Sequence, residues 1–474
     1  MESQRVLEIF KEITAIPRES GHEEPMTRWL EEWAAAHKLQ CSVDNTGNVL
    51  IARPAAPGLE DAETIVLQAH QDMVCEKVGG SCHDFLHDPI NYVIKDGWMI
   101  AEDTTLGADD GIGIAACLAL LEDSAPTCRV ECLFTISEET GMDGAFALEE
   151  GFFSGKTLIN LDSEDEGQLF IGCAGGIHTD IDFSYNLQKI KEGNKVVLLK
   201  ISGGIGGHSG DDINKGRANA VQELARFLYS EMKNGMQLVR IEGGGKSNAI
   251  AREASALVAV PDADGTSERF ASFGRDLSSE FHVTDPDLKA ESSLQCGSFK
   301  AIDDDSATKL ITSLHACPHG VYAMSQDIEG LVETSTNLAS VKMPGDGTIH
   351  VATSQRSSLS SQRDMIASRV EANFALTGAS VSHNSPYPGW APNVDSRILK
   401  ICVDSYRRLF GTDPEVKPIH AGLECGLFLE KFPDLDMISF GPTLRGVHAP
   451  GEKLELASLD KFVELLNDVV CNFR

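Results

Sequence analysis

The stretch that decides the fold is residues 64–72, with the sequence TIVLQAHQD. An apolar, strand-like run ends there in a histidine and an aspartate, which are both metal-ligand types. The same arrangement recurs where Glu138 and Glu139 follow one apolar run and Asp162 follows another. In open α/β sheets, ligands bind beyond the carboxyl ends of the strands, so these side chains are expected to converge. Converging carboxylates require a cation, and we therefore predict a metal site.

Strand and helix patterns alternate around this stretch through about residue 182. Residues 41–53 have the pattern of a hairpin with a turn at residues 45–48, NTGN. Residues 106–113, LGADDGIG, open an apolar run that is long enough for a helix. Such alternation predicts an α/β fold, with a mostly parallel sheet and helices on its faces.

The character of the sequence changes in the middle of the chain. Residues 186–388 contain more Ser, Gly and Asp, and their strand patterns alternate between apolar and polar residues. Helical periodicity resumes at residues 396–410. A length of 474 residues also exceeds what one hydrophobic core usually supports. We predict an α/β catalytic domain, formed by residues 1–185 and 389–474, that is interrupted by an inserted α+β lid domain of residues 186–388.

Two stretches of the inserted region have similar patterns. Each contains a strand, a helix and a further strand, at 254–260, 267–281 and 282–284 in the first stretch and at 348–354, 361–374 and 379–383 in the second. This likeness predicts an internal duplication of an α+β unit. The alternative is a chance similarity of short β-α-β patterns.

The composition is that of an ordinary globular protein, with 42% hydrophobic and 24% charged residues. The formal net charge of −32 would repel phosphate backbones and anionic lipids, so we expect neither a nucleic-acid nor a membrane partner. No signal-peptide pattern opens the sequence and no long apolar run occurs in it, which predicts a cytoplasmic protein. In that compartment we expect its scattered cysteines to be mostly reduced.

The residue types at the strand ends suggest separate roles. His70 offers a neutral imidazole, and Asp72 is placed to hold the other ring N–H. Asp109 lies in a glycine-rich turn at a helix start, where one carboxylate can be presented to two ions. Glu138 and Glu139 are adjacent, so on an extended segment one would ligate a metal while the other faces the substrate.

A two-ion site needs a late histidine as a further ligand. The candidates are His420 and His448, and we prefer His448 because it follows another predicted strand. With His70, Asp109, Glu139 and Asp162 it provides ligands for two ions if Asp109 serves both. Mixed nitrogen and oxygen ligands favour zinc, with cobalt or manganese as substitutes.

At this point the sequence resembles the dinuclear-zinc metallopeptidase family, in its aminoacyl-histidine dipeptidase (Xaa-His dipeptidase, carnosinase-like) branch. The resemblance is carried by LQAHQDMV at 67–74, TTLGADDGIG at 104–113, SEETGMDGA at 137–145 and NLDSE at 160–164. It continues through GGHSG at 206–210, KSNAI at 246–250 and HAGLECG at 420–426. The motifs are long, and they extend over nearly the whole chain.

The resemblance implies a role for each residue of the site. It implies one zinc on His70, Asp109 and Asp162, and a second zinc on Asp109, Glu139 and His448. Glu138 would be the general base that takes a proton from the bridging water, and Asp72 would orient His70. The resemblance also implies a cis peptide bond between Asp109 and Asp110.

The inserted domain is expected to read the substrate. His208, in the sequence GGHSG, is the candidate donor to the tetrahedral oxyanion. For a free substrate carboxylate we expect Arg356, with Asn248 as a polar helper and Arg252 as the rival arginine. For the substrate ammonium group the candidate is Glu424.

We therefore predict a zinc metallodipeptidase that hydrolyses Xaa-His dipeptides such as β-Ala-His, and dipeptides more broadly. An N-acyl-amino-acid deacylase or a tripeptidase with the same metal site is the nearest alternative. The alternative of another class is a non-catalytic protein that binds metal or peptide. Related dipeptidases make a homodimer the expected state, and the sequence leaves open whether His208 acts in its own subunit or in a partner's.

Overall fold

The computed structural model describes residues 1–210, 212–326, 328–420 and 422–473. The chain forms two compact units: unit 1 contains Met1–Cys173, Trp390–Pro418 and Leu423–Arg474, and unit 2 contains Ala174–Gly389 and Ile419–Gly422. The sequence predicted the first change of domain at 185/186. It falls earlier because the strand β9 (Gly175–Ser184) pairs with strands of unit 2.

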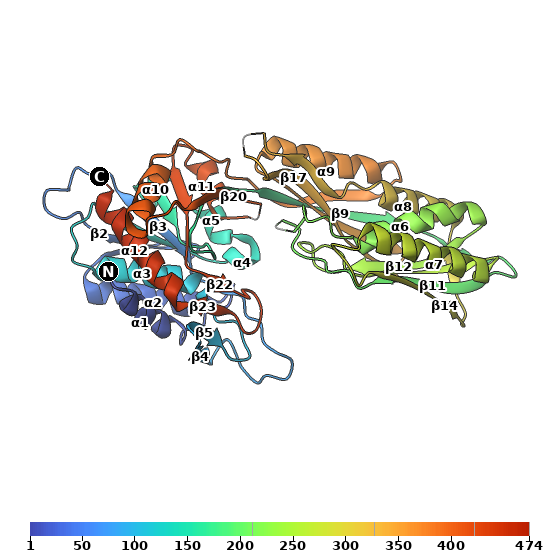
Figure 1. The fold of residues 1–474 in the computed structure, drawn as a ribbon, viewed down its shortest axis with the longest axis horizontal. Helices are drawn as coiled ribbons and strands as arrows, with labels where there is room; N and C mark the ends of the chain where they lie inside the picture. Colours follow the sequence, from blue (N-terminus) through green and yellow to red (C-terminus); the bar gives the residue numbers. More distant parts are fainter. Residues whose placement is uncertain (211, 327, 421, 474) are drawn as a thin grey trace. The chain divides into compact units, whose positions relative to one another are not determined.

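Unit 1 contains an eight-stranded sheet, a four-stranded sheet and the helices that cover them (Figure 1). Its strands are β1 (Gln40–Val43), β2 (Val49–Arg53), β3 (Ile65–His70), β4 (Tyr92–Lys95), β5 (Trp98–Ala101), β6 (Val130–Thr135), β7 (Thr157–Asn160), β8 (Gln168–Cys173), β20 (Glu415–Ile419), β21 (Asp436–Ser439), β22 (Leu444–Arg445) and β23 (Lys453–Glu455). Its helices are α1 (Ser3–Ile13), α2 (Glu24–His37), α3 (Ala108–Glu122), α4 (Glu138–Gly141), α5 (Asp143–Ala147), α10 (Arg397–Phe410), α11 (Cys425–Lys431) and α12 (Leu456–Asn472).

The eight-stranded sheet places the predicted ligands at one edge. Its order is β1-β2-β6-β3-β7-β21-β8-β20. The four central strands β6, β3, β7 and β21 are parallel, whereas β1, β2 and β8 pair antiparallel to their neighbours. The predicted α/β class with a mostly parallel sheet is confirmed. Because β6, β3 and β7 are parallel neighbours, their carboxyl ends bring the segments after residues 70, 135 and 160 together.

One hydrophobic cluster joins the sheet of unit 1 to its long helices. Phe10 of α1, Ile114 of α3, Cys402 of α10 and Phe462 of α12 all belong to it and are at most 2% exposed. The helix α3 is apolar on nearly all sides, which is the pattern of a helix surrounded by core, and its residues Gly111 to Leu121 are buried. The body of α3, which follows Asp109 directly, is therefore held by packing on nearly all sides.

Unit 2 is built on a nine-stranded sheet with helices on one face (Figure 1). Its strands are β9, β10 (Leu187–Lys189), β11 (Lys195–Ser202), β12 (Gln237–Gly244), β13 (Ala254–Val260), β14 (Lys289–Gln295), β15 (Lys300–Ile302), β16 (Gly320–Met324), β17 (Val332–Lys342), β18 (Thr348–Ser357) and β19 (Ser380–Tyr387), of which β10 and β15 form a separate pair. Its helices are α6 (Ala220–Glu231), the 3-10 turn η1 (Met232–Asn234), α7 (Ala263–Glu280), α8 (Asp304–Ala316) and α9 (Ser360–Ala375).

The strand order of unit 2 repeats when it is read outward from the centre. One direction runs β12, β13, β11, β14, and the other runs β17, β18, β9, β19. In each half a helix, α7 or α9, connects the second strand to the last. This equivalence supports the proposal of an internal duplication. The strand predicted at 282–284 is wrong, because those residues lie in turns and the strand of that half is β14.

The residue His319 should make the stability of unit 2 sensitive to acid. Its Nδ1 accepts hydrogen bonds from the N–H of Leu338 (3.3 Å) and from Nδ2 of Asn219 (3.4 Å). Burial lowers the pKa of His319 to about 4, whereas an unfolded histidine has a pKa of about 6.5. As the pH falls, the unfolded chain therefore binds the proton before the folded chain does. The contribution of His319 to the free energy of unfolding is complete above about pH 6.5 and is lost as the pH falls towards 4.

We expect His319→Gln, which keeps an acceptor, to reduce this loss by up to about 2 kcal/mol between pH 7 and pH 5. The measurement is the free energy of unfolding from denaturant titrations at the two pH values. His282→Gln changes an exposed histidine of the same unit and is the control. Equal acid sensitivity in wild type and His319→Gln would contradict the role of His319.

Candidate metal centre and substrate-binding residues

The structure brings together all five residues that the sequence suggested as metal ligands. Nε2 of His70, the last residue of β3, lies 3.0 Å from Oδ1 of Asp109 and 3.3 Å from Oδ1 of Asp162. Nε2 of His448 lies 3.1 Å from Oδ2 of Asp109 and 3.0 Å from Oε2 of Glu139. The two oxygens of Asp109 thus face two different histidines, and Asp109 stands between two groups of ligand atoms.

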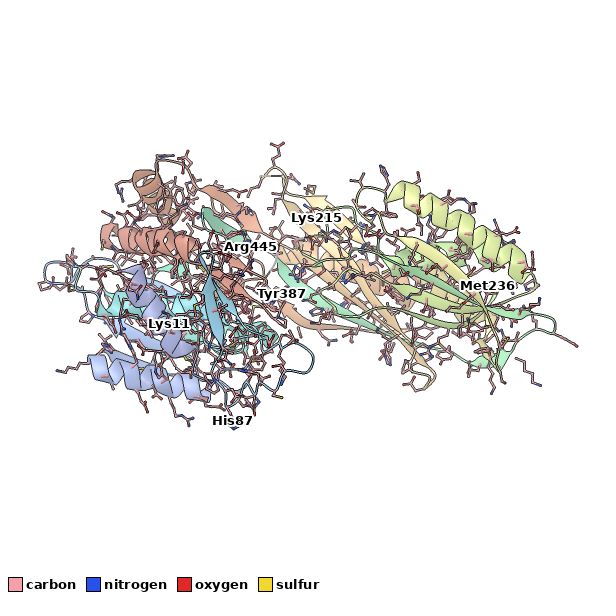
Figure 2. The ribbon with its side chains drawn as sticks, turned by 60° about the horizontal axis from the view of Figure 1, so that its bottom comes forward. Lys11, His87, Lys215, Met236, Tyr387 and Arg445 are labelled. Atoms are coloured by element: carbon pink, nitrogen blue, oxygen red, sulfur yellow. The ribbon has the colours of Figure 1, made fainter. Side chains whose placement is uncertain are left out.

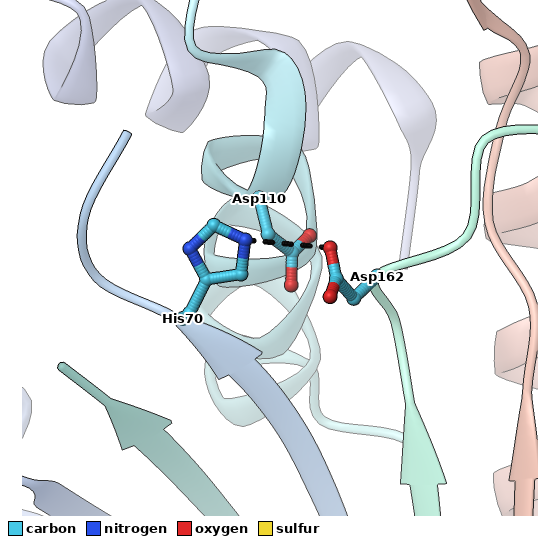
Figure 3. Close-up of side chains that lie close together, drawn as sticks. All are labelled: His70, Asp110 and Asp162. Atoms are coloured by element: carbon cyan, nitrogen blue, oxygen red, sulfur yellow. Dashed lines mark ion pairs between the residues drawn. The ribbon is translucent and has the colours of Figure 1, made fainter. Parts of the chain in front are cut away.

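Asp110 also lies at this centre, although no role was predicted for it. One ligand atom each of His70, Asp110 and Asp162 lie within 4.8 Å of one another, and Figure 3 shows Asp110 beside the ion pair of the other two. Oδ1 of Asp110 accepts the N–H of Gly113 at 3.1 Å. The bond between Asp109 and Asp110 is cis, as the resemblance implied.

Asp72 connects the histidine to the pair of glutamates. Its Oδ1 lies 3.3 Å from Nδ1 of His70 and also accepts the N–H of Glu138 at 3.0 Å. Its Oδ2 accepts the N–H of Glu139 at 3.2 Å and the hydroxyl of Ser20 at 2.8 Å. One buried carboxylate therefore orients the His70 ring and fixes the backbone that carries both glutamates.

The glutamates are not on an extended segment, and that prediction is wrong. They begin the short helix α4, after Ser137 has turned the chain with a φ of 52°. The carboxylate of Asp72 at the first N–H groups of α4 favours the helical turn, because these N–H groups have no partner within the helix. The local sequence does not reveal this, since Asp72 is 66 residues away.

The carboxylates of the centre are close together and raise one another's affinity for protons. Burial raises the pKa values of Glu138, Glu139 and Asp162, and the charge of Asp109 raises all three further. Burial also opposes ionisation of Asp109, yet hydrogen bonds from His448 and His70 hold its pKa below the usual value. Several buried carboxylates beside two imidazoles form a donor set of the kind that binds zinc or a similar divalent ion. The residues present therefore fit a metal.

Glu424 does not lie where a substrate ammonium could reach it. It is 0% exposed, and its Oε2 accepts hydrogen bonds from Nε2 of Gln68 (2.6 Å) and Oγ1 of Thr135 (2.8 Å). Burial raises its pKa to about 7. The structure therefore gives no support to its predicted role. Glu424 directly precedes α11, and its carboxylate contacts Gln68 of β3 and Thr135 of β6.

His208 lies in a turn of unit 2 that needs glycine. Gly206 and Gly207, which precede it, have φ angles of 69° and 130°. The N–H of His208 donates to Oδ2 of Asp212 at 2.8 Å, and its Nδ1 accepts the N–H of Gly210 at 3.3 Å. The backbone of His208 also forms a bridge with Ala249, next to the exposed Asn248. The motifs at 206–210 and 246–250 are therefore neighbours in the structure.

Arg356, near the end of β18, is a buried guanidinium. It is 9% exposed, and its Nη1 donates to the hydroxyl of Tyr387 at 3.1 Å (Figure 2 labels Tyr387, the last residue of β19). Within the described part of the chain, Nε of Arg356 has no hydrogen-bond partner and the guanidinium forms no ion pair with a carboxylate. The rival Arg252 is exposed and donates from Nε to the carbonyl of Gly204. Of these two arginines, Arg356 is the buried one, and its Nε is without a hydrogen-bond partner among the described residues.

The rival histidine, His420, belongs to unit 2 and contacts Ser335 there. Its Nε2 lies 2.8 Å from the Ser335 hydroxyl, and it is 8% exposed. His448, in contrast, lies in unit 1 with the other ligands.

Comparison with known proteins assigns the chain to a family. Peptidase family M20/M25/M40 matches residues 66–472. The chain belongs to this family. Its members carry out metal-dependent peptide hydrolysis, so the protein is a metal-dependent peptide hydrolase of the M20 type. The alternative of a non-catalytic binding protein finds no support in these comparisons.

Two relatives are similar over their full lengths. The cytosol non-specific dipeptidase of Escherichia coli is 36% identical over 98% of this chain and 97% of its own. The crystal structure of aminoacylhistidine dipeptidase from Vibrio alginolyticus is 38% identical, with a TM-score of 0.88 over 99% of this chain and 96% of its own. Aminopeptidase PepT from Bacillus cereus, at 16% identity and a TM-score of 0.58 over 99% of this chain and 98% of its own, shares the fold. Among the described residues, no helix has the length and apolar character needed to span a membrane.

Proposed function

We propose that this M20 peptidase cleaves dipeptides, including Xaa-His dipeptides such as β-Ala-His, with two divalent ions. The observation that carries the proposal is the position of Asp109, whose two oxygens lie 3.0 Å and 3.1 Å from Nε2 of His70 and of His448. A carboxylate in that position is suited to bind both ions, one through each oxygen. The full-length similarity to two dipeptidases, one of them an aminoacylhistidine dipeptidase, supports the substrate class.

The proposed ligands are divided between the two ions. His70 and Asp162 would hold one ion, Glu139 and His448 the other, and Asp109 both. When bound, such a pair of ions activates a water molecule and polarises the peptide carbonyl. We propose zinc as the native metal, with cobalt or manganese as substitutes.

Glu138 is the proposed general base. Its carboxylate would accept a proton from the attacking water and return that proton to the leaving amine nitrogen. Burial, with the nearby charges of Glu139, Glu424 and Asp109, raises its pKa and so strengthens its affinity for a proton. Asp72 would act on the reaction through others, because it contacts the His70 ring and the backbone N–H groups of both glutamates.

Unit 2 is the proposed substrate-binding lid. The imidazole of His208 would donate a hydrogen bond to the oxyanion, and Asn248 in the adjacent loop would assist in binding. Arg356 would bind the C-terminal carboxylate of the dipeptide. This assignment follows from its charge, because a buried guanidinium without an acidic partner in the described residues is stabilised when an anionic ligand arrives.

We expect Arg356→Lys to raise KM for dipeptides by about 10- to 100-fold, since one charge-assisted hydrogen bond contributes about 1.5–3 kcal/mol. The effect should disappear for dipeptide amides, which lack the carboxylate. Steady-state kinetics on each acid and its amide provide the measurement. Arg252→Lys is the matched control and should leave KM unchanged. A rise in KM that is equal for acids and amides would rule out carboxylate binding by Arg356.

The substrate class is tested with a panel of peptides. We expect the zinc-loaded protein to cleave β-Ala-His and other Xaa-His dipeptides, and several unrelated dipeptides, with higher kcat/KM than tripeptides or acetylated amino acids. Higher kcat/KM for acetylated amino acids would identify a deacylase instead, and higher kcat/KM for tripeptides would identify a tripeptidase.

The assembly and the location are also proposals. We propose a cytoplasmic homodimer, in line with the similarity to a cytosolic dipeptidase and with the expected behaviour of related enzymes. Light scattering would measure the oligomeric state. Mixing inactive His208→Ala chains with inactive Glu138→Gln chains would show whether His208 acts across subunits, because only then does activity return.

A further inference from the structure

A buried carboxylate, Glu452, binds the backbone of the loop that carries Asp109. Glu452 is 2% exposed. Its Oε2 accepts the N–H groups of Leu106 (2.8 Å) and Gly107 (3.1 Å), and its Oε1 accepts those of Ala108 (2.8 Å) and Asp109 (3.4 Å). Neither the sequence motifs nor the proposed mechanism gives Glu452 a role.

These four N–H groups lie just before the regular turns of α3, because Asp109 and Asp110 have non-helical φ and ψ angles. The residue before α3 is Gly107, which has a φ of 68° and no side chain that could cap the helix. Oδ1 of Asp110 accepts the N–H of Gly113 at the start of the regular helix. Glu452 supplies acceptors for the N–H groups before it, and it lies 345 residues after Gly107 in the chain. Its carboxylate therefore fixes the backbone of Asp109.

The same residue fixes the segment that carries His448. The N–H of Glu452 donates to the carbonyl of Ala449 at 3.2 Å, and its own carbonyl accepts the N–H of Ala101 at 3.0 Å. The N–H of Gly451 donates to the carbonyl of Thr104 at 2.9 Å. Only three residues separate His448 from Glu452, so the carboxylate links the turn of His448 directly to the turn of Asp109.

Arg18 holds the other side of the Asp109 loop. Its guanidinium is buried and donates to the carbonyl of Gly107, while it also donates to the carbonyls of Gln71 (3.1 Å) and Asp72 (2.8 Å). Gly107 is thus bound through its N–H by Glu452 and through its carbonyl by Arg18. A Cβ atom at Gly107 would collide with Arg18 and Met73, so this position requires glycine.

We propose that Glu452 and Arg18 are positioning residues for the metal centre. Together they join the segments of His70, Asp109 and His448, and they thereby set the distances between these three ligands. Asp109 is the ligand that would bind both ions. The inference rests on the proposed metal site. It predicts that these two residues control metal affinity although neither contacts a ligand side chain in the described structure.

The test is Glu452→Gln, which keeps the size of the side chain but loses the charge and one of the two acceptors. We expect metal affinity to fall by about 10- to 100-fold, as with other residues that orient metal ligands. Competition of the protein with a chromogenic chelator for zinc measures this affinity without any assay of activity. At saturating zinc, kcat should recover towards the wild-type value and KM for the dipeptide should stay within twofold.

Glu131→Gln is the matched control. Glu131 is also 2% exposed, and it likewise accepts backbone N–H groups, those of Ser154 (2.7 Å) and Gly155 (3.2 Å), but it does so at the opposite end of β6 from the metal-type ligands. We expect it to lower the melting temperature and to leave zinc affinity unchanged. Arg18→Lys should weaken zinc binding as Glu452→Gln does.

Two results would overturn the inference: zinc affinity in Glu452→Gln that equals wild type, or an equal loss in Glu131→Gln. If Glu452→Gln does not fold, Glu452→Asp replaces it, because the charge remains and only the reach is shortened. Its zinc affinity must then lie below that of wild type for the inference to stand. Absence of zinc binding by the wild-type protein would instead refute the proposed function.

Discussion

Replacing Glu138 with Gln is expected to lower kcat by about 10²- to 10⁴-fold while the metal content stays unchanged. Glu139 holds His448 at 3.0 Å, whereas Glu138 forms no ion pair with either histidine of the centre in the described structure. The amide of Gln cannot accept the proton of the attacking water, but it fills the same space. Metal analysis and steady-state kinetics on the same preparation measure both quantities.

Glu150→Gln, an exposed glutamate of unit 1, is the control for this experiment and should behave as wild type. A fully loaded Glu138→Gln protein with more than about a tenth of the wild-type kcat would contradict the assignment of the base. Loss of metal in Glu138→Gln would show that Glu138 is a ligand and not the base.

Asp109→Ala is expected to abolish activity by removing the ligand that both ions share. Oδ1 of Asp109 faces His70 and Oδ2 faces His448, so the substitution removes an oxygen from each group of ligands. We expect zinc affinity to fall by several orders of magnitude and no activity to return when zinc is added. Isothermal titration with zinc and kinetics at increasing zinc concentration test the two parts.

Asp110→Asn is the informative control, because Asp110 lies next to Asp109 in sequence and also lies beside His70 and Asp162. If Asp109 is the shared ligand, Asp110→Asn keeps more zinc affinity and more activity than Asp109→Ala. If Asp110→Asn instead loses more zinc affinity and more activity than Asp109→Ala, Asp110 is the shared ligand.

The fold was predictable where one local pattern determines an element. The apolar runs of β3, β6 and β7 are fully buried strands, and the hairpin predicted at 41–53 forms as β1 and β2. The strand predicted at 282–284 failed because β14 begins later and alternates between partly exposed and exposed residues, with no apolar run to mark it. Strand order in unit 2 depends on long-range pairing, which no local pattern encodes.

The site was predictable for side chains that follow buried strands, and less so for those that depend on distant contacts. His70, Asp109 and Asp162 converge because the strands and the helix that carry them are neighbours. The helical turn at Glu138 and the burial of Glu424 both arise from contacts with residues far away in sequence, Asp72 in one case and Gln68 in the other. Only the folded chain brings these partners together.

Two metal ions that share Asp109 are central to the proposed mechanism, and counting bound ions tests this most directly. Native mass spectrometry on zinc-loaded protein should find two ions per chain in wild type. One ion should remain in Asp162→Ala, which removes a ligand of the ion bound at His70. One ion should also remain in His448→Ala, which removes a ligand of the ion bound at Glu139. A single ion in wild type, or two ions retained in both variants, would contradict the account.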